Sequence, residues 1–398
     1  MDFTSLLELD RLAKSTGHRL TARRVLYETL RRDAGRHFMG ISGPRGAGKT
    51  ILLQQLAAAS EDGCYVSLDT LAADTDLFAL LKGLVERYGF RRFFLDEVHF
   101  LKDGLGALKK IYDFLEVRVI FTSSVALRMK ESAHDLARRV RIHRLDYFSF
   151  REYLAFSHGI HLPRLSVEDF LAGRIDPAYL RTVDRWEPYL SGGLMPFALD
   201  EPEPMPLLKS TVETVIARDI PATLRLHVDE LDTLRRLLAF VGRSAVDGIN
   251  YSSLSKNLGI TKYKAEQYVR AFEDAFLLLP LFPQGTNVLR EPKVLLMPPV
   301  RLLYREREEA RGGLREDFVA LAMRQTGIPL HYLKGTRGQK TPDFHIPHAG
   351  GSVVLEVGGK GKGRTQFKGF QADRKIVLAE GAALAADRRP LHLLGFLA

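Results

Sequence analysis

One eight-residue segment constrains this chain of 398 residues more than any other. Gly43-Pro44-Arg45-Gly46-Ala47-Gly48-Lys49-Thr50 matches the pattern G-x-x-x-x-G-K-[ST] at every position. A short apolar run, Phe38 to Ser42, precedes it, and a helical stretch rich in Leu, Gln and Ala, residues 51–59, follows it. A strand, a glycine-rich turn and a helix in this order are the context that a phosphate-binding loop requires. Its backbone N–H groups and the helix N-terminus bind phosphate oxygens.

Two side chains of this loop are expected to carry its chemistry. The Lys49 ammonium should reach the β- and γ-phosphates, and the Thr50 hydroxyl should ligate Mg²⁺. The motif therefore predicts ATP and Mg²⁺ as cofactors. The residues expected to bind them are Gly43, Pro44, Arg45, Gly46, Ala47, Gly48, Lys49 and Thr50.

A second motif lies downstream of the loop. Residues 93–95 form an apolar run that ends in Asp96 and Glu97. We expect Asp96 to hold Mg²⁺, directly or through water, and Glu97 to polarise the attacking water as general base. The two motifs together predict Mg²⁺-dependent ATP hydrolysis.

Apolar runs and helical segments alternate through the first part of the chain. Residues 64–68, 92–96 and 117–121 have strand character, and helices are predicted between them. This alternation predicts a parallel sheet with helices on both faces. Thr122, Ser123 and Ser124 follow the strand at 117–121, where a polar side chain can orient the water that attacks ATP, and Ser123 and Ser124 are taken as the catalytic candidates.

Composition narrows the setting and the partners. The single cysteine, Cys64, excludes a disulfide within the chain and favours a reducing, cytoplasmic setting. No apolar run approaches the ~20 residues that a membrane helix needs, so we expect no membrane partner. Lys and Arg number 58 against 48 Asp and Glu, which gives a formal net charge of +10. This excess attracts polyanions and supports nucleic acid as a partner.

Residues 251–261 and the helix after them predict a helix-turn-helix. Leu254 and Leu258 lie four positions apart on one face, Gly259 permits a tight turn, and Thr261 can cap the next helix. That helix would present cations to phosphates and an amide to base edges. The residues concerned are Lys262, Lys264, Gln267 and Arg270. DNA is the expected partner, while protein binding or packing between domains stays open.

At these motifs the chain resembles AAA+ ATPases of the origin-recognition-like and STAND-like branch. More closely, it resembles a prokaryotic family in which the ATPase module precedes a winged helix and a domain like PD-(D/E)xK nucleases. Residues 94–99 resemble that family's L-D-E signature, and 121–124 resemble its T-G-S-S strand end, with Ser123 in place of glycine. Residues 136–154 resemble its L-x-G-R and S-F-x-E-Y-L block, and 189–196 its Y-L-x-G-G-x-P motif.

The resemblance implies two further site residues. Arg139 matches an arginine that, in AAA+ rings, completes the neighbouring subunit's ATP site, with Arg138 and Arg141 as competitors for the role. Pro196 matches a proline that packs near the adenine base in related ATPases. A homo-oligomer is therefore expected, a hexameric ring by the habit of AAA+ proteins.

The resemblance also implies a nuclease-like acidic site near the C-terminus. Glu316 lies on a predicted helix, Asp343 follows Pro342, and Glu356 lies on a predicted strand. The E-x-K pattern needs a lysine two residues after Glu356, where this chain has Gly358. Nuclease activity is therefore not expected, although the lysines of the basic loop that follows could reach in. Those lysines, which also suit DNA phosphates, are Lys360 and Lys362.

The expected fold class is α/β in five parts. A P-loop AAA+ core with a parallel sheet is followed by a helical lid, a winged helix-turn-helix and a restriction-endonuclease-like α/β domain. The predicted boundaries are N-terminal helices at 1–35, the core at 36–145, the lid at 146–228, the winged helix at 229–290 and the nuclease-like domain at 291–398.

Three functions compete at this point. The first is an oligomeric ATPase that moves or remodels duplex or branched DNA, for example by branch migration. The second is a nucleotide-controlled switch of the STAND type, with slow turnover. The third is a metal-dependent nuclease that the ATPase regulates. The complete ATP motifs, the helix-turn-helix and the positive charge favour the first.

Overall fold

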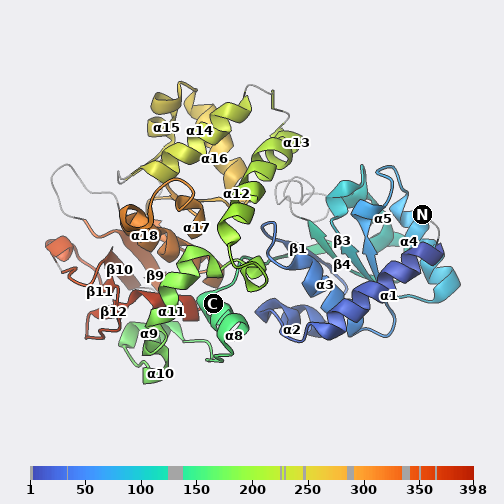
Figure 1. Cartoon of the computed structure of the whole chain (residues 1–398), viewed down its shortest axis with the longest axis horizontal. Helices are drawn as coiled ribbons and strands as arrows, with labels where there is room; N and C mark the ends of the chain where they lie inside the picture. Colours follow the sequence, from blue (N-terminus) through green and yellow to red (C-terminus); the bar gives the residue numbers. More distant parts are fainter. Residues whose placement is uncertain are drawn as a thin grey trace. The chain divides into compact units, whose positions relative to one another are not determined.

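The computed structural model describes residues 3–33, 35–123, 138–224, 226–227, 230–244, 248–284, 291–333, 341–348, 351–363 and 365–398. The chain divides into two compact units, Met1–Tyr147 and Phe148–Ala398 (Figure 1). Within the described residues, no helix combines the length and the apolar character that a membrane crossing requires.

The first unit is built on a five-stranded sheet in the order β2-β3-β4-β1-β5. Every pair of neighbouring strands runs parallel, which confirms the predicted parallel α/β core. The carboxyl ends of all five strands therefore meet at one edge. The strands are β1 Phe38–Ser42, β2 Gly63–Ser67, β3 Arg92–Asp96, β4 Arg118–Ser123 and β5 Val140–Arg144.

The helices of this unit cover the sheet and bury a core of aliphatic and aromatic side chains that includes Phe93, Leu95 and Phe121. They are α1 Phe3–Arg19, α2 Val25–Arg32, α3 Lys49–Ala58, α4 Leu77–Tyr88 and α5 Gly104–Phe114, with short 3₁₀ turns at Leu68–Thr70 and Val98–Phe100.

Helix α1 packs closely against α3. A Cβ atom at Gly17 would lie 2.2 Å from the Gln54 carbonyl oxygen, so only glycine permits this approach. The Asp10 carboxylate accepts a hydrogen bond of 2.7 Å from the Tyr65 backbone N–H on β2. The N-terminal helix α1 therefore packs against α3, the helix that begins at Lys49 of the phosphate-binding motif.

The second unit begins with short helices. Helix α8 starts in a reciprocal cap, because Ser149 accepts from the Glu152 N–H while Glu152 accepts from the Ser149 N–H, both at 3.2 Å. The elements are α8 Phe150–His158, α9 Val167–Ala172, α10 Pro177–Leu180, α11 Val183–Pro188, α12 Pro204–Thr214 and α13 Ile220–Leu224, with π-helical turns at Tyr189–Gly193 and Val215–Asp219 and a 3₁₀ turn at Pro196–Leu199.

Three helices and a two-stranded antiparallel sheet follow. They are α14 Glu230–Arg243, α15 Tyr251–Leu258, α16 Lys262–Asp274, β6 Leu278–Leu281 and β7 Lys293–Leu296. Gly259 ends α15 at a φ of 69°, and Thr261 caps α16 by accepting from the Lys264 N–H at 3.2 Å. Both residues do what the helix-turn-helix pattern predicts, and the winged-helix assignment stays a prediction.

The chain ends in a second sheet, ordered β12-β11-β10-β9-β8, with parallel pairs at the β10–β12 side and antiparallel pairs at the β8 side. A fully buried Asp317 on α18 accepts hydrogen bonds from Arg301 and from the Leu296 N–H, which joins this part to β7. The elements are α17 Pro298–Arg301, α18 Arg307–Thr326, β8 His331–Tyr332, β9 Phe344–His348, β10 Gly351–Gly358, β11 Arg374–Ala379 and β12 Arg388–Pro390, with 3₁₀ turns at Thr365–Phe367 and Leu391–Phe396.

Candidate nucleotide-binding site

The predicted phosphate-binding loop connects the end of β1 to the start of α3. Gly46 and Gly48 have φ values of 75° and 85°, which residues with a Cβ atom rarely adopt. A Cβ atom at Gly43 would lie 2.1 Å from the Leu145 carbonyl oxygen. All three motif glycines are therefore required by the backbone, which explains the pattern without reference to any ligand.

Lys49 is the first residue of α3, and its side chain is buried. Its ammonium donates hydrogen bonds of 2.9 Å to the carbonyl oxygens of Gly43 and Pro44. Carbonyl groups of the loop thus position the Lys49 ammonium. Oxygens of the β- and γ-phosphates carry negative charge and are stronger acceptors for the same N–H groups. Thr50 follows on the first turn of α3 with an exposed side chain.

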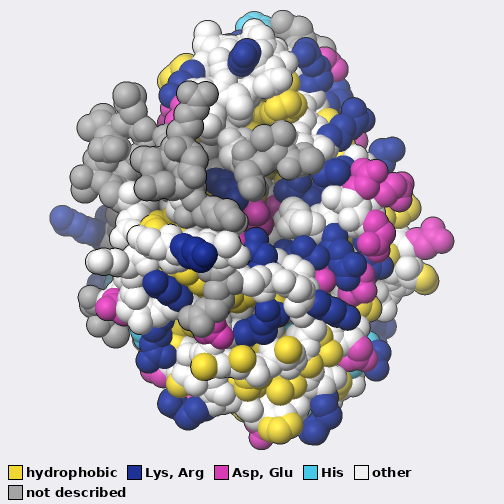
Figure 2. Space-filling model, turned by 90° about the vertical axis from the view of Figure 1, so that its left-hand side faces the viewer, with side chains coloured by type: hydrophobic (Ala, Val, Ile, Leu, Met, Phe, Trp, Pro, Cys, Tyr) yellow, Lys and Arg dark blue, Asp and Glu magenta, His cyan; other side chains and the backbone are white. Residues whose placement is uncertain are grey.

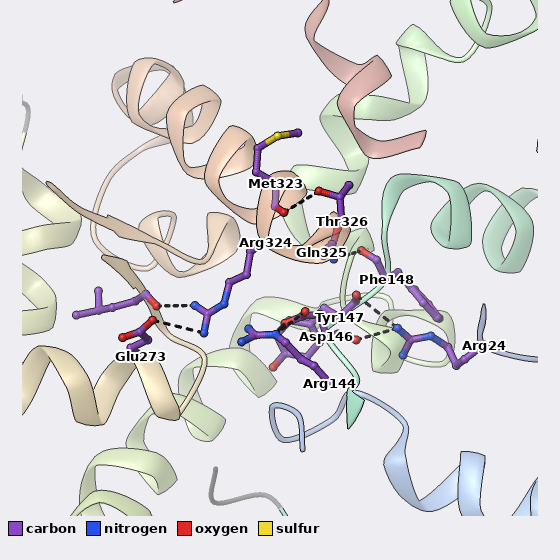
Figure 3. Close-up of polar contacts among 11 residues, drawn as sticks. Arg24, Arg144, Asp146, Tyr147, Phe148, Glu273, Met323, Arg324, Gln325 and Thr326 are labelled. Atoms are coloured by element: carbon purple, nitrogen blue, oxygen red, sulfur yellow. Dashed lines mark hydrogen bonds and ion pairs between the residues drawn. The ribbon is translucent and has the colours of Figure 1, made fainter. Parts of the chain in front are cut away.

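Arg24, which sequence reasoning missed, contacts both the loop and the segment that follows β5, and Figure 3 shows its contacts with that segment. Its guanidinium donates to the Ala47 carbonyl at 2.7 Å and to the Asp146 carbonyl at 2.8 Å. The Tyr147 hydroxyl donates to the Arg45 carbonyl at 2.9 Å, and burial raises the pKa of this phenol. No local pattern around Arg24 predicts these contacts, because its partners lie elsewhere in the chain.

The acidic motif lies at the end of β3. The Asp96 carboxylate is buried and accepts hydrogen bonds from the Tyr65 hydroxyl, at 2.9 Å, and from the Thr122 hydroxyl. Burial and the neighbouring Asp96 raise the pKa of Tyr65, so this phenol remains a neutral donor. Hydroxyl donors satisfy the carboxylate without neutralising its charge, which leaves it suited to a cation.

Glu97 adopts the left-handed conformation, with φ 55°, which is uncommon for a residue with a side chain. The Thr122 hydroxyl accepts its backbone N–H at 2.8 Å and so holds this turn. A Glu97 carboxylate oxygen lies 3.1 Å from His99 Nδ1. Held backbone strain of this kind concentrates at functional sites.

Of the three polar residues predicted at this strand end, Thr122 is the one whose hydroxyl contacts Asp96 and the Glu97 N–H, while Ser123 and Ser124 are the catalytic candidates. Strand β4 lies between β1 and β3, so its end is flanked by the P-loop strand and the acidic strand. Ser123 is buried and pairs with Ser42 on β1, and Ser124 lies outside the described residues. Because side chains alternate along a strand, neighbours on β4 face opposite sides, and only the register shows which one meets Asp96.

The residue types fit the expected cofactors. Mg²⁺ is usually bound by one or two protein oxygen ligands together with waters and substrate phosphates. The Thr50 hydroxyl and the Asp96 carboxylate are the residues that would hold it here. When bound, the cation would neutralise charge on the β- and γ-phosphates.

Arg139 lies at the amino-terminal end of the strands, immediately before β5, whereas the loop lies at their carboxyl end. Its guanidinium makes two hydrogen bonds, of 2.9 and 3.0 Å, to the Asp113 carboxylate, and these lower the pKa of Asp113. Arg141 lies 3.6 Å from Asp33. Arg139 thus cannot reach the loop of its own sheet, and its role in a neighbour's site stays a prediction. Pro196, in the second unit, starts a 3₁₀ turn, and its adenine role is also untested.

The predicted DNA-contacting side chains of α16 have partners within the unit. Lys262 pairs with Glu291, Lys264 with Glu230 at 2.8 Å, and Arg270 with Glu266. Gln267 donates to the Tyr263 hydroxyl at 3.0 Å. Hydrogen bonds from Lys264 and Tyr268 lower the pKa of Glu230 to about 2.

The nuclease-like residues come together in the second unit. Asp343 directly precedes β9 and accepts the Val357 N–H at 2.7 Å, beside the buried Glu356 on β10. Burial, with Glu356 and then Glu316 as further causes, raises the pKa of Asp343 to about 7. Glu316 itself forms an ion pair of 2.7 Å with Lys293. No group of three or more His, Cys, Asp or Glu is placed to hold a metal in the part of the chain that the structure describes.

Lys362 contacts the buried acid of this site. Its ammonium lies 2.5 Å from a Glu356 carboxylate oxygen. A Cβ atom at Gly358 would lie 2.5 Å from the Cγ and Cδ atoms of Lys362, so the glycine makes room for this side chain to pass. The chain lacks the lysine that the E-x-K pattern requires at position 358. The ammonium of Lys362, from the following loop, lies beside Glu356 instead. Lys360 is exposed.

Two family models match parts of the chain. One is described as an AAA domain and matches residues 35–154, which span the P-loop and the acidic strand end. This match supports the resemblance to AAA+ ATPases over these residues, and it supports nucleotide binding. The other, described as a domain of unknown function, matches residues 183–297.

Whole-chain comparisons add relatives without adding roles. The uncharacterized protein MJ1637 of Methanocaldococcus jannaschii is 28% identical over 399 residues, covering 89% of this chain and 83% of that protein. The Aeropyrum pernix ORC1 protein, solved in complex with DNA, is 12% identical with a TM-score of 0.29, covering 76% of this chain and 92% of that one. The C. elegans protein PCH-2 is 14% identical with a TM-score of 0.26, covering 69% of each chain. TM-scores this low carry no argument about function.

Proposed function

We propose that this chain is an AAA+ ATPase that hydrolyses ATP at the P-loop and acts on DNA as an oligomeric motor or remodeller of duplex or branched DNA. One observation carries the ATPase assignment. The end of β4 lies between the loop that ends in Lys49 and the acidic pair Asp96-Glu97, and its Thr122 holds both acids. The loop binds phosphates, and Glu97 takes the proton of the attacking water.

DNA as partner rests on charge and on the α15–α16 pair. The lysines of these ion pairs are about half exposed, so DNA phosphates can approach them even while the carboxylates of Glu230 and Glu291 stay in place. Release of counterions favours such phosphate contacts. Lys262→Ala combined with Lys264→Ala should weaken duplex binding, whereas Lys209→Ala on α12 should leave it unchanged.

Steady-state ATP hydrolysis tests the assignment. We would compare rates without DNA and with single-stranded DNA, duplex and a four-way junction, using Glu97→Gln as the blank. Stimulation by one DNA form supports the motor and identifies its substrate. A slow rate that no DNA form changes would replace the motor with the nucleotide-controlled switch.

The oligomer is tested through Arg139. Arg139→Ala should lose hydrolysis and keep nucleotide binding. Mixing it with Glu97→Gln should restore activity, because a mixed assembly contains sites with a normal glutamate and a neighbour's arginine. The absence of rescue at any mixing ratio would show that the arginine does not act between subunits.

A second candidate function, metal-dependent nuclease, is favoured by the Lys362–Glu356 pair. Asp343 and Glu356 would hold the cation, with waters and a substrate phosphate completing its shell. A polar pocket of about 320 Å³ adjoins Val357 and is lined by Lys293, Arg305, Arg315 and Glu316, among others. Lys and Arg side chains also gather across the face of the molecule that Figure 2 shows. Such a surface suits a phosphate backbone.

Plasmid cleavage in Mg²⁺ or Mn²⁺ tests this second candidate. Cleavage should disappear in Asp343→Ala and in Lys362→Ala, and persist in Lys360→Ala. The double change Gly358→Lys with Lys362→Gly returns the lysine to the strand and should keep activity. Absence of cleavage by the unaltered chain with either metal would reject the nuclease.

A further inference from the structure

A groove of about 850 Å³ lies at the amino-terminal edge of the sheet of the first unit, at the opposite end of the strands from the P-loop. It has no part in the function proposed above. Four arginines line it, together with two acids, a tyrosine and three apolar side chains. The lining residues are Arg36, Phe38, Asp62, Arg91, Arg92, Tyr112, Leu115, Glu116, Val117 and Arg118.

The arginines follow the strand order across this edge. Arg92 begins β3, Arg118 begins β4, and Arg36 lies just before β1, while Arg139 lies just before β5. The order β3-β4-β1-β5 therefore places an arginine at or just before the start of each successive strand. Adjacent strands are about 4.8 Å apart, so the backbone positions of these arginines follow one another along the edge.

Backbone hydrogen bonds keep the row in register. The N–H groups of Arg91 and Arg92 donate to the Asp62 carbonyl at 3.0 and 3.2 Å, and the Arg118 N–H donates to the Arg91 carbonyl at 2.8 Å. The Phe38 N–H donates to the Arg139 carbonyl at 2.8 Å. The arginines thus project from a fixed edge, which reduces the entropy lost when a ligand binds.

Carboxylates balance part of this charge, since Arg36 is one of the cations that lower the pKa of Asp113. Arg92 pairs with Asp62 at 3.2 Å. Among the described residues, neither Arg36 nor Arg91 forms an ion pair with a carboxylate, and Arg36 lies over the Tyr112 ring at 5.1 Å. A row of guanidinium groups that exceeds its local acids attracts a linear polyanion.

An exposed aromatic side chain lies next in sequence to the residues that line the groove. Phe114, at the end of α5, is 74% exposed and directly precedes the groove residue Leu115. An exposed ring beside guanidinium groups is the combination with which proteins bind single strands, because bases stack on the ring while cations contact phosphates. In duplex DNA the bases are already stacked on one another, so the ring favours a single strand.

We propose that this groove binds the phosphate backbone of a single nucleic-acid strand along the row Arg92, Arg118, Arg36, with Arg91 as a further contact and Phe114 stacking on a base. The groove lies at the opposite end of the strands from the ATP site.

Binding of the full chain to a fluorescent thirty-nucleotide oligothymidylate tests the proposal, with a duplex of the same length measured in parallel. Arg36→Ala combined with Arg91→Ala should lower single-strand affinity and reduce the slope of log affinity against log salt by about 1.4, since each lost phosphate contact contributes about 0.7. Phe114→Ala should weaken single-strand binding roughly tenfold and leave duplex binding unchanged. Arg11→Ala on α1 is the control for loss of one exposed arginine.

Three results would overturn the proposal. The first is unchanged single-strand affinity and salt slope in the double variant. The second is an equal loss of single-strand and duplex binding in Phe114→Ala. The third is a change of oligomer mass without a change of DNA affinity, which would assign the groove to contact between copies of this chain. ATP hydrolysis without DNA, measured in the same variants, separates these outcomes from failure of the proposed ATPase.

Discussion

The two units each bury a carboxylate beside a second, half-buried acid, and they hold the buried carboxylate in different ways. In the first unit, Asp96 accepts from two hydroxyl groups, of Tyr65 and Thr122. In the second unit, Glu356 meets the ammonium of Lys362. Neutral donors fix a carboxylate and leave its charge for a cation, whereas a lysine balances the charge before any cation arrives. The comparison therefore distinguishes a site prepared for metal and phosphate from one whose charge is already compensated.

The largest expected effect concerns the first unit. Lys49→Ala should reduce ATP hydrolysis by at least about 10²-fold, the usual cost of removing one group that stabilises charge in a transition state. It should leave the fold intact, because the ammonium donates to carbonyl groups within the loop itself. Hydrolysis and thermal unfolding measured together check this. Loss of the fold would contradict the view that Lys49 serves the ligand.

The next effect concerns the second unit. Lys362→Ala leaves Glu356 buried without its cation, which should cost about 3 kcal/mol of unfolding free energy. The carboxyl pKa in the folded variant should rise above its unfolded value, so stability is retained at pH 5 and lost as pH rises towards 8. Denaturant unfolding at both pH values checks this, with Lys360→Ala as the control. An equal loss at the two pH values would show that Lys362 acts by packing alone.

Thr122→Val should have a smaller effect and lower the free energy of unfolding by about 2 kcal/mol. It removes a buried hydroxyl that donates to Asp96 and accepts the Glu97 N–H. ATP turnover should fall about tenfold while nucleotide binding is retained. Thr122→Ser keeps the hydroxyl and should restore turnover. Equal turnover in the valine and serine variants would remove Thr122 from the site.

His392 gives the smallest predicted effect at moderate pH. Burial lowers the pKa of this imidazole to about 4, with its Nε2 3.1 Å from the Tyr179 carbonyl oxygen. The unfolded chain binds the proton near pH 6.5 and the folded chain does not, so stability is full above that value and falls as pH decreases towards 4. The loss at pH 5.5 should be about 1 kcal/mol. His392→Gln should abolish this dependence of the free energy of unfolding on pH. An unchanged dependence in the variant would assign it to other groups.

Much of the nucleotide site follows from the sequence because its parts are contiguous. The loop from Gly43 to Thr50 and the pair Asp96-Glu97 are read as short motifs, and alternating strands and helices predict the parallel sheet. The contacts of Arg24 are not predictable in this way, because its guanidinium meets a carbonyl 122 positions away. The same holds for Thr122, where strand register decides which hydroxyl meets the acid.

The second unit shows the same limit more strongly. The E-x-K pattern requires a lysine at position 358, where this chain has Gly358, so the sequence predicts that the site lacks its lysine. A loop that folds back supplies Lys362 instead, and sequence spacing along a strand does not describe a loop. The sequence identifies residues that act through local geometry better than residues that act across a turn or a sheet.

The central claim, that the P-loop and Glu97 form an ATPase site, is tested most directly by one paired measurement. Nucleotide binding and steady-state hydrolysis of radiolabelled ATP would be measured on the unaltered chain and on Glu97→Gln. The account predicts that both bind ATP in Mg²⁺ and that only the unaltered chain releases phosphate. Equal hydrolysis by the two proteins, or no ATP binding by either, would contradict it.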